Sequence, residues 1–209
     1  MKKIVYSFLS IALLIGGIFI LTGCDNKTKE DKNKVEISYT HGKGTFKLLV
    51  PKNEDGTPKY EFTKEKPSEI SSSSTFYLVT DTTVFGFATT GLAYNSSTAY
   101  KAKYGDKKAS FEGYLEFIED EELFNKSYLP GLEQFEINGR KALRYYNLSG
   151  SSGNYKYYGY FYFVGVDDIY NGSKAQITVN YKTNDKPTEI KEFDDETLSI
   201  IKSLKIEAN

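Results

Sequence analysis

Residues 134–148 read QFEINGRKALRYYNL and carry the strongest fold signal in the chain. Asn138 and Gly139 both tolerate a positive φ, and this dipeptide is typical of the two-residue turn that joins antiparallel strands. Apolar residues flank the turn on both sides. We therefore predict a β-hairpin in which residues 134–137 pair with residues 141–148.

Further strand signals lie on both sides of this hairpin. Residues 35–39 alternate between apolar and polar side chains, and a glycine-containing turn separates them from a second apolar stretch that ends at Pro51. This pattern predicts an N-terminal hairpin of residues 35–39 and 45–50. The other predicted strands are residues 76–80, 83–94, 155–166 and 176–182.

Three segments show the period of an amphipathic helix. A short helix is predicted to begin after Ser96 or Ser97 and to end at Gly105. Ser110 is the expected N-cap of a second helix, whose apolar face comprises Phe111, Tyr114, Leu115 and Ile118. Asp194 is the expected N-cap of the last helix, whose apolar face comprises Leu198, Ile201 and Leu204.

The order of these elements predicts an α+β domain, an antiparallel sheet with helices packed on it. Residues 133–206 resemble the back half of the PsbP/Mog-type α/β/α sandwich, through INGRKA at 137–142, the strands 155–164 and 176–182, and a final helix that ends in IIKSLKI. The front half is similar more loosely, through Gly44-Thr45-Phe46 running into Pro51. The resemblance implies a binding or assembly role and carries over no catalytic residue.

The N-terminus has the pattern of an export signal. Residues 1–24 read MKKIVYSFLSIALLIGGIFILTGC, with two lysines before an apolar stretch and small residues before a cysteine. Leu21, Thr22, Gly23 and Cys24 resemble the lipobox of bacterial lipoproteins. The resemblance implies a diacylglyceryl group on the Cys24 thiol and cleavage just before this residue. The alternative is an uncleaved N-terminal membrane helix.

We therefore expect a signal peptide at 1–23, a lipidated cysteine with a charged tether at 24–34, and one domain at 35–209. Each buried methylene contributes about 0.8 kcal/mol, so two acyl chains hold a protein stably on a bilayer. The expected address is the extracytoplasmic face of a cell membrane. The covalent lipid on Cys24 is the sole cofactor that the sequence predicts.

Composition excludes several kinds of chemistry. The 27 basic and 28 acidic residues provide no positive field to recruit nucleic acid. Cys24 is the single cysteine and His41 the single histidine, so one chain can form neither a disulfide nor a multi-histidine metal site. The acidic runs at 119–122, 167–168 and 194–195 lack calcium-loop spacing. We predict no catalytic residue and no metal site.

Residues 155–164 read YKYYGYFYFV and place aromatic rings on both faces of a strand. One interpretation is a strand covered on both faces, in the middle layer of a sandwich. The other is an exposed stripe of Tyr158, Tyr160 and Tyr162 that binds a partner, since tyrosine provides a large amphipathic contact area.

Three functions remain open from the sequence. The first is a membrane-anchored, non-catalytic module that binds an envelope protein or glycan. The second is an enzyme that processes envelope polymers with two converging carboxylates. The third is a structural accessory subunit of an envelope complex, which would expose a large apolar patch.

Overall fold

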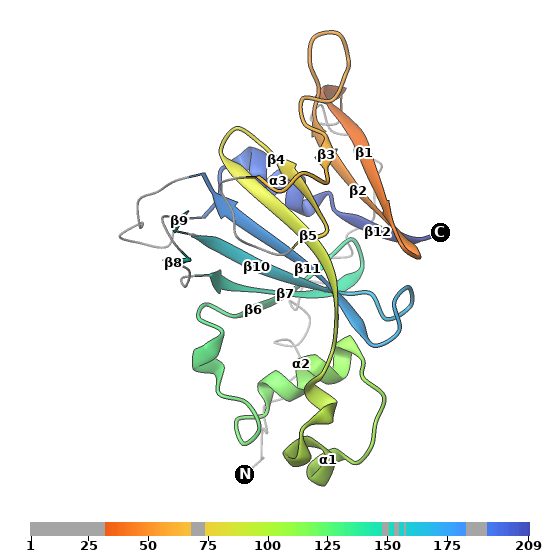
Figure 1. Cartoon of the computed structure of the whole chain (residues 1–209), viewed down its shortest axis with the longest axis vertical. Helices are drawn as coiled ribbons and strands as arrows, with labels where there is room; N and C mark the ends of the chain where they lie inside the picture. Colours follow the sequence, from red (N-terminus) through yellow and green to blue (C-terminus); the bar gives the residue numbers. More distant parts are fainter. Residues whose placement is uncertain (1–31, 68–73, 148–150, 153–154, 157, 183–191) are drawn as a thin grey trace, which may run out of the picture. The chain divides into compact units, whose positions relative to one another are not determined.

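The structure is a computed structural model that describes residues 32–67, 74–147, 151–152, 155–156, 158–182 and 192–209. The chain divides into Met1–Lys32 and Asn33–Asn209, and the sheets and helices lie in the second unit. Its described residues form antiparallel sheets with three α-helices, which confirms the predicted α+β class (Figure 1). The closer resemblance to the PsbP/Mog-type sandwich stays a prediction.

The larger sheet has seven strands, and each strand is antiparallel to its neighbours. The hairpin β6–β7 forms one end of the sheet, so β6 is an edge strand (Figure 1). In spatial order the strands are β3 (Phe62–Thr63), β4 (Phe76–Val79), β5 (Thr83–Gly91), β11 (Ser173–Tyr181), β10 (Gly159–Gly165), β7 (Arg140–Asn147) and β6 (Glu133–Ile137).

Smaller elements complete the domain. A three-stranded sheet contains β1 (Lys34–His41), β2 (Gly44–Pro51) and β12 (Lys205–Ala208), and a two-stranded ladder contains β8 (Ser151–Ser152) and β9 (Tyr155–Lys156). The helices are α1 (Thr98–Tyr104), α2 (Phe111–Glu119) and α3 (Asp195–Lys202), with 3-10 turns η2 (Tyr94–Ser96) and η3 (Lys126–Tyr128).

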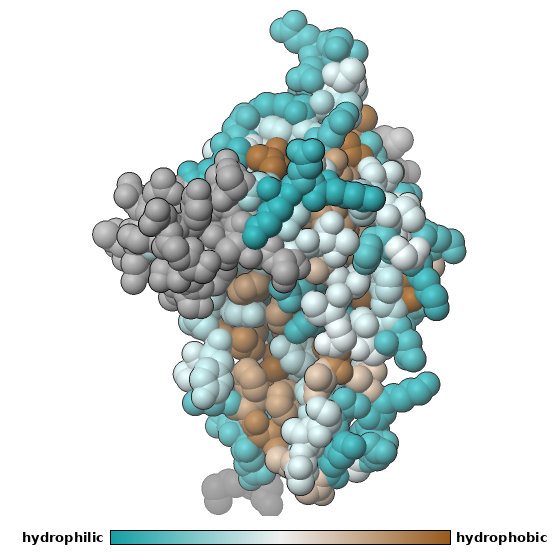
Figure 2. Space-filling view, viewed as in Figure 1, coloured by the Kyte–Doolittle hydropathy of each residue, from teal (hydrophilic) through white to brown (hydrophobic). Residues whose placement is uncertain are grey.

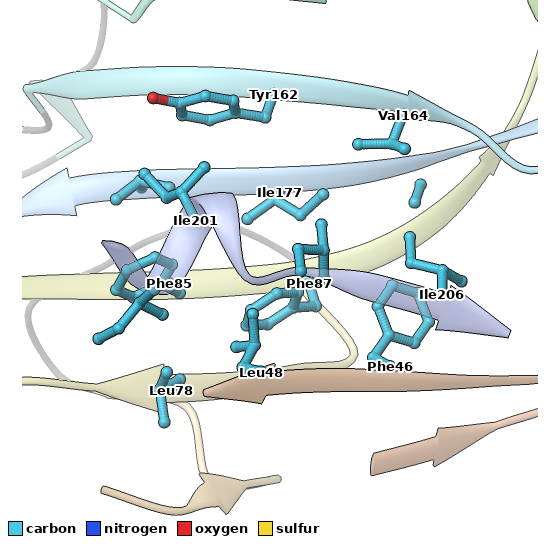
Figure 3. Close-up of a cluster of buried hydrophobic side chains, with 14 of the residues drawn as sticks. Phe46, Leu48, Leu78, Phe85, Phe87, Tyr162, Val164, Ile177, Ile201 and Ile206 are labelled. Atoms are coloured by element: carbon cyan, nitrogen blue, oxygen red, sulfur yellow. The ribbon is translucent and has the colours of Figure 1, made fainter. Parts of the chain in front are cut away.

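The main core lies on the face of the large sheet that the three-stranded sheet and α3 cover. Figure 3 shows Phe46 and Leu48 of β2, Ile201 of α3 and Ile206 of β12 among side chains of β4, β5, β10 and β11. Phe46 is fully buried, and its ring meets Phe76 edge-on with 5.2 Å between centroids. Burial of these rings and branched side chains supplies the main driving force for folding.

A second core lies on the opposite face, under α2. Phe111, Leu115 and Ile118 of this helix pack with Leu143 and Phe163 of the sheet. Phe117, Phe124 and other members at its margin are only partly buried. Apolar colour accordingly gathers over the lower half of the face drawn in Figure 2, where Figure 1 places α1 and α2.

Both predicted hairpins are confirmed. Asn138 and Gly139 have φ values of 47° and 78°, which is the conformation that a type I′ turn requires. This turn pairs Ile137 with Arg140 and sets the register of β6 against β7. In the N-terminal hairpin, Gly42 has a φ of 58°, and His41 pairs with Gly44.

The predicted helix starts are also confirmed. The side chains of Ser97, Ser110 and Asp194 accept hydrogen bonds from the backbone N–H groups of Tyr100, Gly113 and Thr197. Gly105 ends α1 with a φ of 76°, a conformation that glycine adopts without strain.

The prediction that the last helix runs through Leu204 is wrong. Helix α3 ends at Lys202, and Ser203 then uses its hydroxyl to accept from the Leu49 N–H and to donate to the Ile200 carbonyl. Residues Lys205–Ala208 form β12 instead, because they pair antiparallel with the open edge of β2. A helical spacing of apolar residues cannot reveal this distant partner.

The single long strand predicted at 155–166 is also wrong. Residues Tyr155–Lys156 form β9 and pair with β8, whereas β10 begins at Gly159 and pairs with β7 and β11. Gly159 allows a close approach of the β11 backbone, because a Cβ there would lie 1.8 Å from the Val179 carbonyl oxygen. The tether predicted at 24–34 is one residue too long, since Lys34 already opens β1.

Candidate functional site

The tyrosines predicted as a binding stripe are core residues. Tyr158, Tyr160 and Tyr162 are 6%, 1% and 3% exposed. Strand β10 lies between β11 and β7, and its Tyr160 and Tyr162 rings pack into the main core. The prediction of an exposed stripe is therefore wrong, because both faces of the strand are covered and none of the three residues is more than 6% exposed.

The lipobox residues Leu21, Thr22, Gly23 and Cys24 lie outside the described residues, as does the signal peptide at 1–23. Lipidation of Cys24 stays a prediction. In the part of the chain that the structure describes, the helices are too short or too polar to cross a membrane.

A groove of about 670 Å³ lies between the edge strand β6 and helix α3. This volume falls within the range of about 300–1,000 Å³ that is usual for ligand pockets. The residues that line the groove are Glu133, Phe135, Glu136, Ile137, Asn138, Arg144, Tyr162, Glu192, Leu198, Ile201 and Lys202.

The floor of the groove is apolar. Phe135 and Ile137 of β6 contribute to it from one side, and Leu198 and Ile201 of α3 from the other. Phe135 packs edge-on against the Tyr162 ring, with 6.1 Å between centroids. Such a floor, bordered by a few polar groups, is the usual composition of a small-molecule or peptide site.

Asn138 fixes the two walls of the groove relative to each other. Its side-chain amide donates to the carbonyl of Lys202, the last residue of α3, at 3.1 Å and to the carbonyl of Leu204, just before β12, at 2.8 Å. The residue that forms the β6–β7 turn therefore also caps the Lys202 carbonyl, which the helix leaves free. This coupling gives the groove a defined width.

Charged side chains surround Arg144 at the other end of the groove. The Arg144 Nε donates to Glu133 at 2.6 Å, and its two terminal nitrogens donate to the Glu192 carboxylate at 2.9 and 3.0 Å. The guanidinium also lies over the Tyr160 ring, 5.0 Å from its centroid. The Arg144 side chain is 19% exposed, whereas each glutamate side chain is 53% exposed.

Two carboxylates thus share one guanidinium at this end. Burial acts to lower the pKa of Arg144, but the hydrogen bonds that it donates to Glu192, Tyr162 and Glu133 raise this pKa above the usual arginine value. Arg144 is therefore a permanent cation, and it balances only one of its two partners. This end of the groove carries a net charge of −1.

The other residues that the sequence singles out have structural partners. The His41 carbonyl accepts a hydrogen bond from the Tyr170 hydroxyl at the end of β1. Asp120 and Glu122 pair with Lys103, Asp167 accepts from the Phe111 N–H, and Asp168 pairs with Arg140. Within the described ranges, no three His, Cys, Asp or Glu side chains are grouped to hold a metal ion.

The sequence analysis did not predict the groove, although the position of one charged pair at its end follows from the hairpin turn. The two-residue turn at Asn138-Gly139 fixes the pairing of Glu133 with Arg144, five positions from the turn on each strand. The contributions of Glu192 and α3 come from a distant segment that no local pattern places there. Comparison with protein-family models, with curated proteins and with solved structures finds no match to this chain.

Proposed function

We propose that this chain is a lipid-anchored protein of the extracytoplasmic membrane face, and that it is a non-catalytic binding module with its ligand site in the groove between β6 and α3. The export pattern and lipobox resemblance of residues 1–24 support the address. The groove supports the binding role.

The single observation that carries the binding role is the combination of an apolar floor with a charged end. Phe135, Leu198 and Ile201 present apolar surface to the groove, and the Arg144 cluster provides charge at one end. Apolar surface supplies affinity by leaving water, while a few fixed polar groups set orientation. The hydrogen bonds of Asn138 hold β6 and α3 in place before a ligand binds, so less conformational entropy is lost on binding.

The geometry favours binding over hydrolysis. Glu133 and Glu192 converge, as an acid/base pair of carboxylates would, but both are hydrogen-bonded to the same guanidinium. An acid/base pair needs carboxyl oxygens that face a substrate, whereas one oxygen of Glu133 and both oxygens of Glu192 accept hydrogen bonds from the guanidinium. The accessory-subunit role calls for a large exposed apolar patch; Tyr128 is the one large apolar side chain of the described residues that is individually exposed, and partly buried apolar side chains such as Phe117 and Phe124 gather beside α2.

Hydrogen–deuterium exchange of the full chain tests the groove. An envelope extract from cells that make the protein is added, and exchange is compared with and without it. We expect slower exchange in β6 and α3, whose amides border the groove, and unchanged exchange in α1 as the internal control. Protection confined to other elements, or no protection, would show that the groove is not the ligand site.

A further inference from the structure

Strand β6 has one edge that no other strand covers in the part of the chain that the structure describes. It pairs with β7 on one side and is the last strand in the order of the large sheet. Among the described residues, no strand pairs with its other side. An open edge presents a row of backbone donors and acceptors that another chain can use.

The hairpin register identifies which backbone groups face outward. In a two-residue turn, the flanking pair Ile137 and Arg140 exchanges hydrogen bonds. Bonded and non-bonded pairs alternate along an antiparallel ladder, so Phe135 and Glu133 also bond inward to β7. The N–H and C=O groups of Gln134 and Glu136 therefore point to the open edge.

The groove begins at this edge. Glu136 lines it, although strand alternation directs the Glu136 side chain away from Phe135 and Ile137, to the opposite face of the sheet. Glu136 therefore lines the groove with its backbone. An occupant that uses this backbone would lie alongside β6, with the apolar floor beneath it.

The dimensions fit a strand. Strand β6 has five residues and spans about 17 Å at the usual rise. In a strand added at this edge, alternate side chains would point to the face that carries Phe135 and Leu198. A volume of about 670 Å³ accommodates such side chains beside α3.

The charged side chains at the two ends of the groove indicate in which orientation an occupant would bind. The Arg144 end of the groove has two carboxylates on one guanidinium, and both carboxylates are largely open to solvent. A basic side chain complements this end by pairing with the glutamate that Arg144 leaves unbalanced. Lys202 stands at the opposite end of the groove, beside Asn138.

We infer that the ligand is an extended polypeptide segment that pairs with the open edge of β6 as an additional strand. It inserts alternate apolar side chains between β6 and α3, and it places a basic side chain at Glu133 and Glu192. Main-chain pairing supplies the affinity, and the floor with its charged end supplies the specificity. This inference rests on the proposed function of the groove.

Selection from a phage-displayed library of random dodecapeptides tests the inference. The full chain, purified in detergent, is used as wild type and as Glu136→Pro, Glu136→Ala and Leu198→Glu. Proline removes the outward N–H at an edge position, where it is tolerated, and alanine keeps that N–H. We expect enriched peptides with alternating apolar residues and a Lys or Arg, bound at least tenfold more weakly by Glu136→Pro than by Glu136→Ala.

A second measurement remains valid if the proline variant folds poorly. Synthetic versions of one selected peptide, each N-methylated at a single position, are titrated against the wild type. Strand pairing predicts that methylation weakens binding at every second position, because only alternate amides face β6. A loss without this two-residue period would overturn the pairing.

The remaining outcomes separate the inference from the function on which it rests. Peptides that bind Glu136→Pro and Glu136→Ala equally, but lose binding in Leu198→Glu, would overturn strand pairing and leave the groove as a site. Failure to enrich any peptide would overturn the peptide class. The wild type could also prove to be a dimer that Glu136→Pro converts to a monomer, with no peptide enriched. That result would assign the edge of β6 to a second copy of the chain and would also overturn the peptide inference.

Discussion

Arg140 and Asp168 form a bidentate ion pair, with N–O distances of 2.7 and 2.9 Å, that joins the β6–β7 hairpin to the turn after β10. The same guanidinium donates to the carbonyls of Ile206 at 3.0 Å and Gly165 at 3.1 Å. One side chain thus connects the large sheet to β12 of the small sheet. Asn138, two residues before Arg140, donates hydrogen bonds to the carbonyls of Lys202 and Leu204. The segment INGRKA therefore links the large sheet to both α3 and β12 beside the groove.

Replacing Arg140 should cost more stability than replacing Asp168. We expect Arg140→Ala to lower the free energy of unfolding by about 1–3 kcal/mol, because two carbonyls lose their donor. Asp168→Ala should cost less than about 1 kcal/mol, since the Asp168 side chain is 62% exposed. Urea unfolding of both variants measures the difference, and equal losses would contradict the assigned roles.

Lys174 predicts a stability change at alkaline pH. Burial lowers the pKa of Lys174 to about 8, and its ammonium lies 3.5 Å from the centroid of the Phe163 ring. The folded state then binds fewer protons than the unfolded state between pH 8 and the ordinary lysine pKa. Folding stability should therefore rise across this window, by at most about 3 kcal/mol. Thermal unfolding at pH 7.5 and 9.5 measures it.

Lys174→Met is the matched variant for this effect. It removes the titrating group and keeps an unbranched chain between the rings of Phe163 and Tyr114. We expect the variant to be more stable than the wild type at pH 7.5 and to lose the rise. An identical pH profile in both proteins would mean that Lys174 does not titrate in this range.

Gly159 should be intolerant of any side chain. A Cβ there would meet the Val179 carbonyl oxygen at 1.8 Å, and both atoms belong to paired central strands. We expect Gly159→Ala to lower the free energy of unfolding by about 3 kcal/mol or more, because the backbone must shift. Gly91→Ala is the control, since nothing lies within 4 Å of its Cβ position, and it should change stability by about 0.5 kcal/mol or less.

Local signals predicted much of the fold. Turn chemistry at Asn138-Gly139 and the caps at Ser97, Ser110 and Asp194 act within a few residues, so the sequence contains all of the relevant information. The same reasoning failed at β12. Its pairing with β2 joins segments about 160 residues apart, and a helical period through Leu204 competed with it.

The candidate site was harder to predict than the fold for the same reason. Hairpin register brings Glu133 to Arg144, but Glu192 reaches the guanidinium from 48 residues away. The tyrosine stripe illustrates a related limit. An aromatic strand looks alike whether it is exposed or central, and the layers that cover both its faces decide which it is.

Cys24→Ser tests the proposed membrane anchor. The variant lacks the thiol that accepts the diacylglyceryl group, so we expect it to incorporate no labelled palmitate. It should appear in the medium or as an uncut precursor of higher mass. Normal processing and membrane retention in this variant would contradict the lipoprotein proposal.

The most direct test of the groove as the ligand site is site-specific photo-crosslinking on intact cells. A diazirine-bearing lysine analogue replaces Lys202, which lines the groove in the last turn of α3, or Lys101, which lies in the last turn of α1. The account predicts a light-dependent adduct at position 202 that Leu198→Glu abolishes, and none at position 101. Equal adduct yields at the two positions, or an adduct at 202 that Leu198→Glu leaves unchanged, would contradict it.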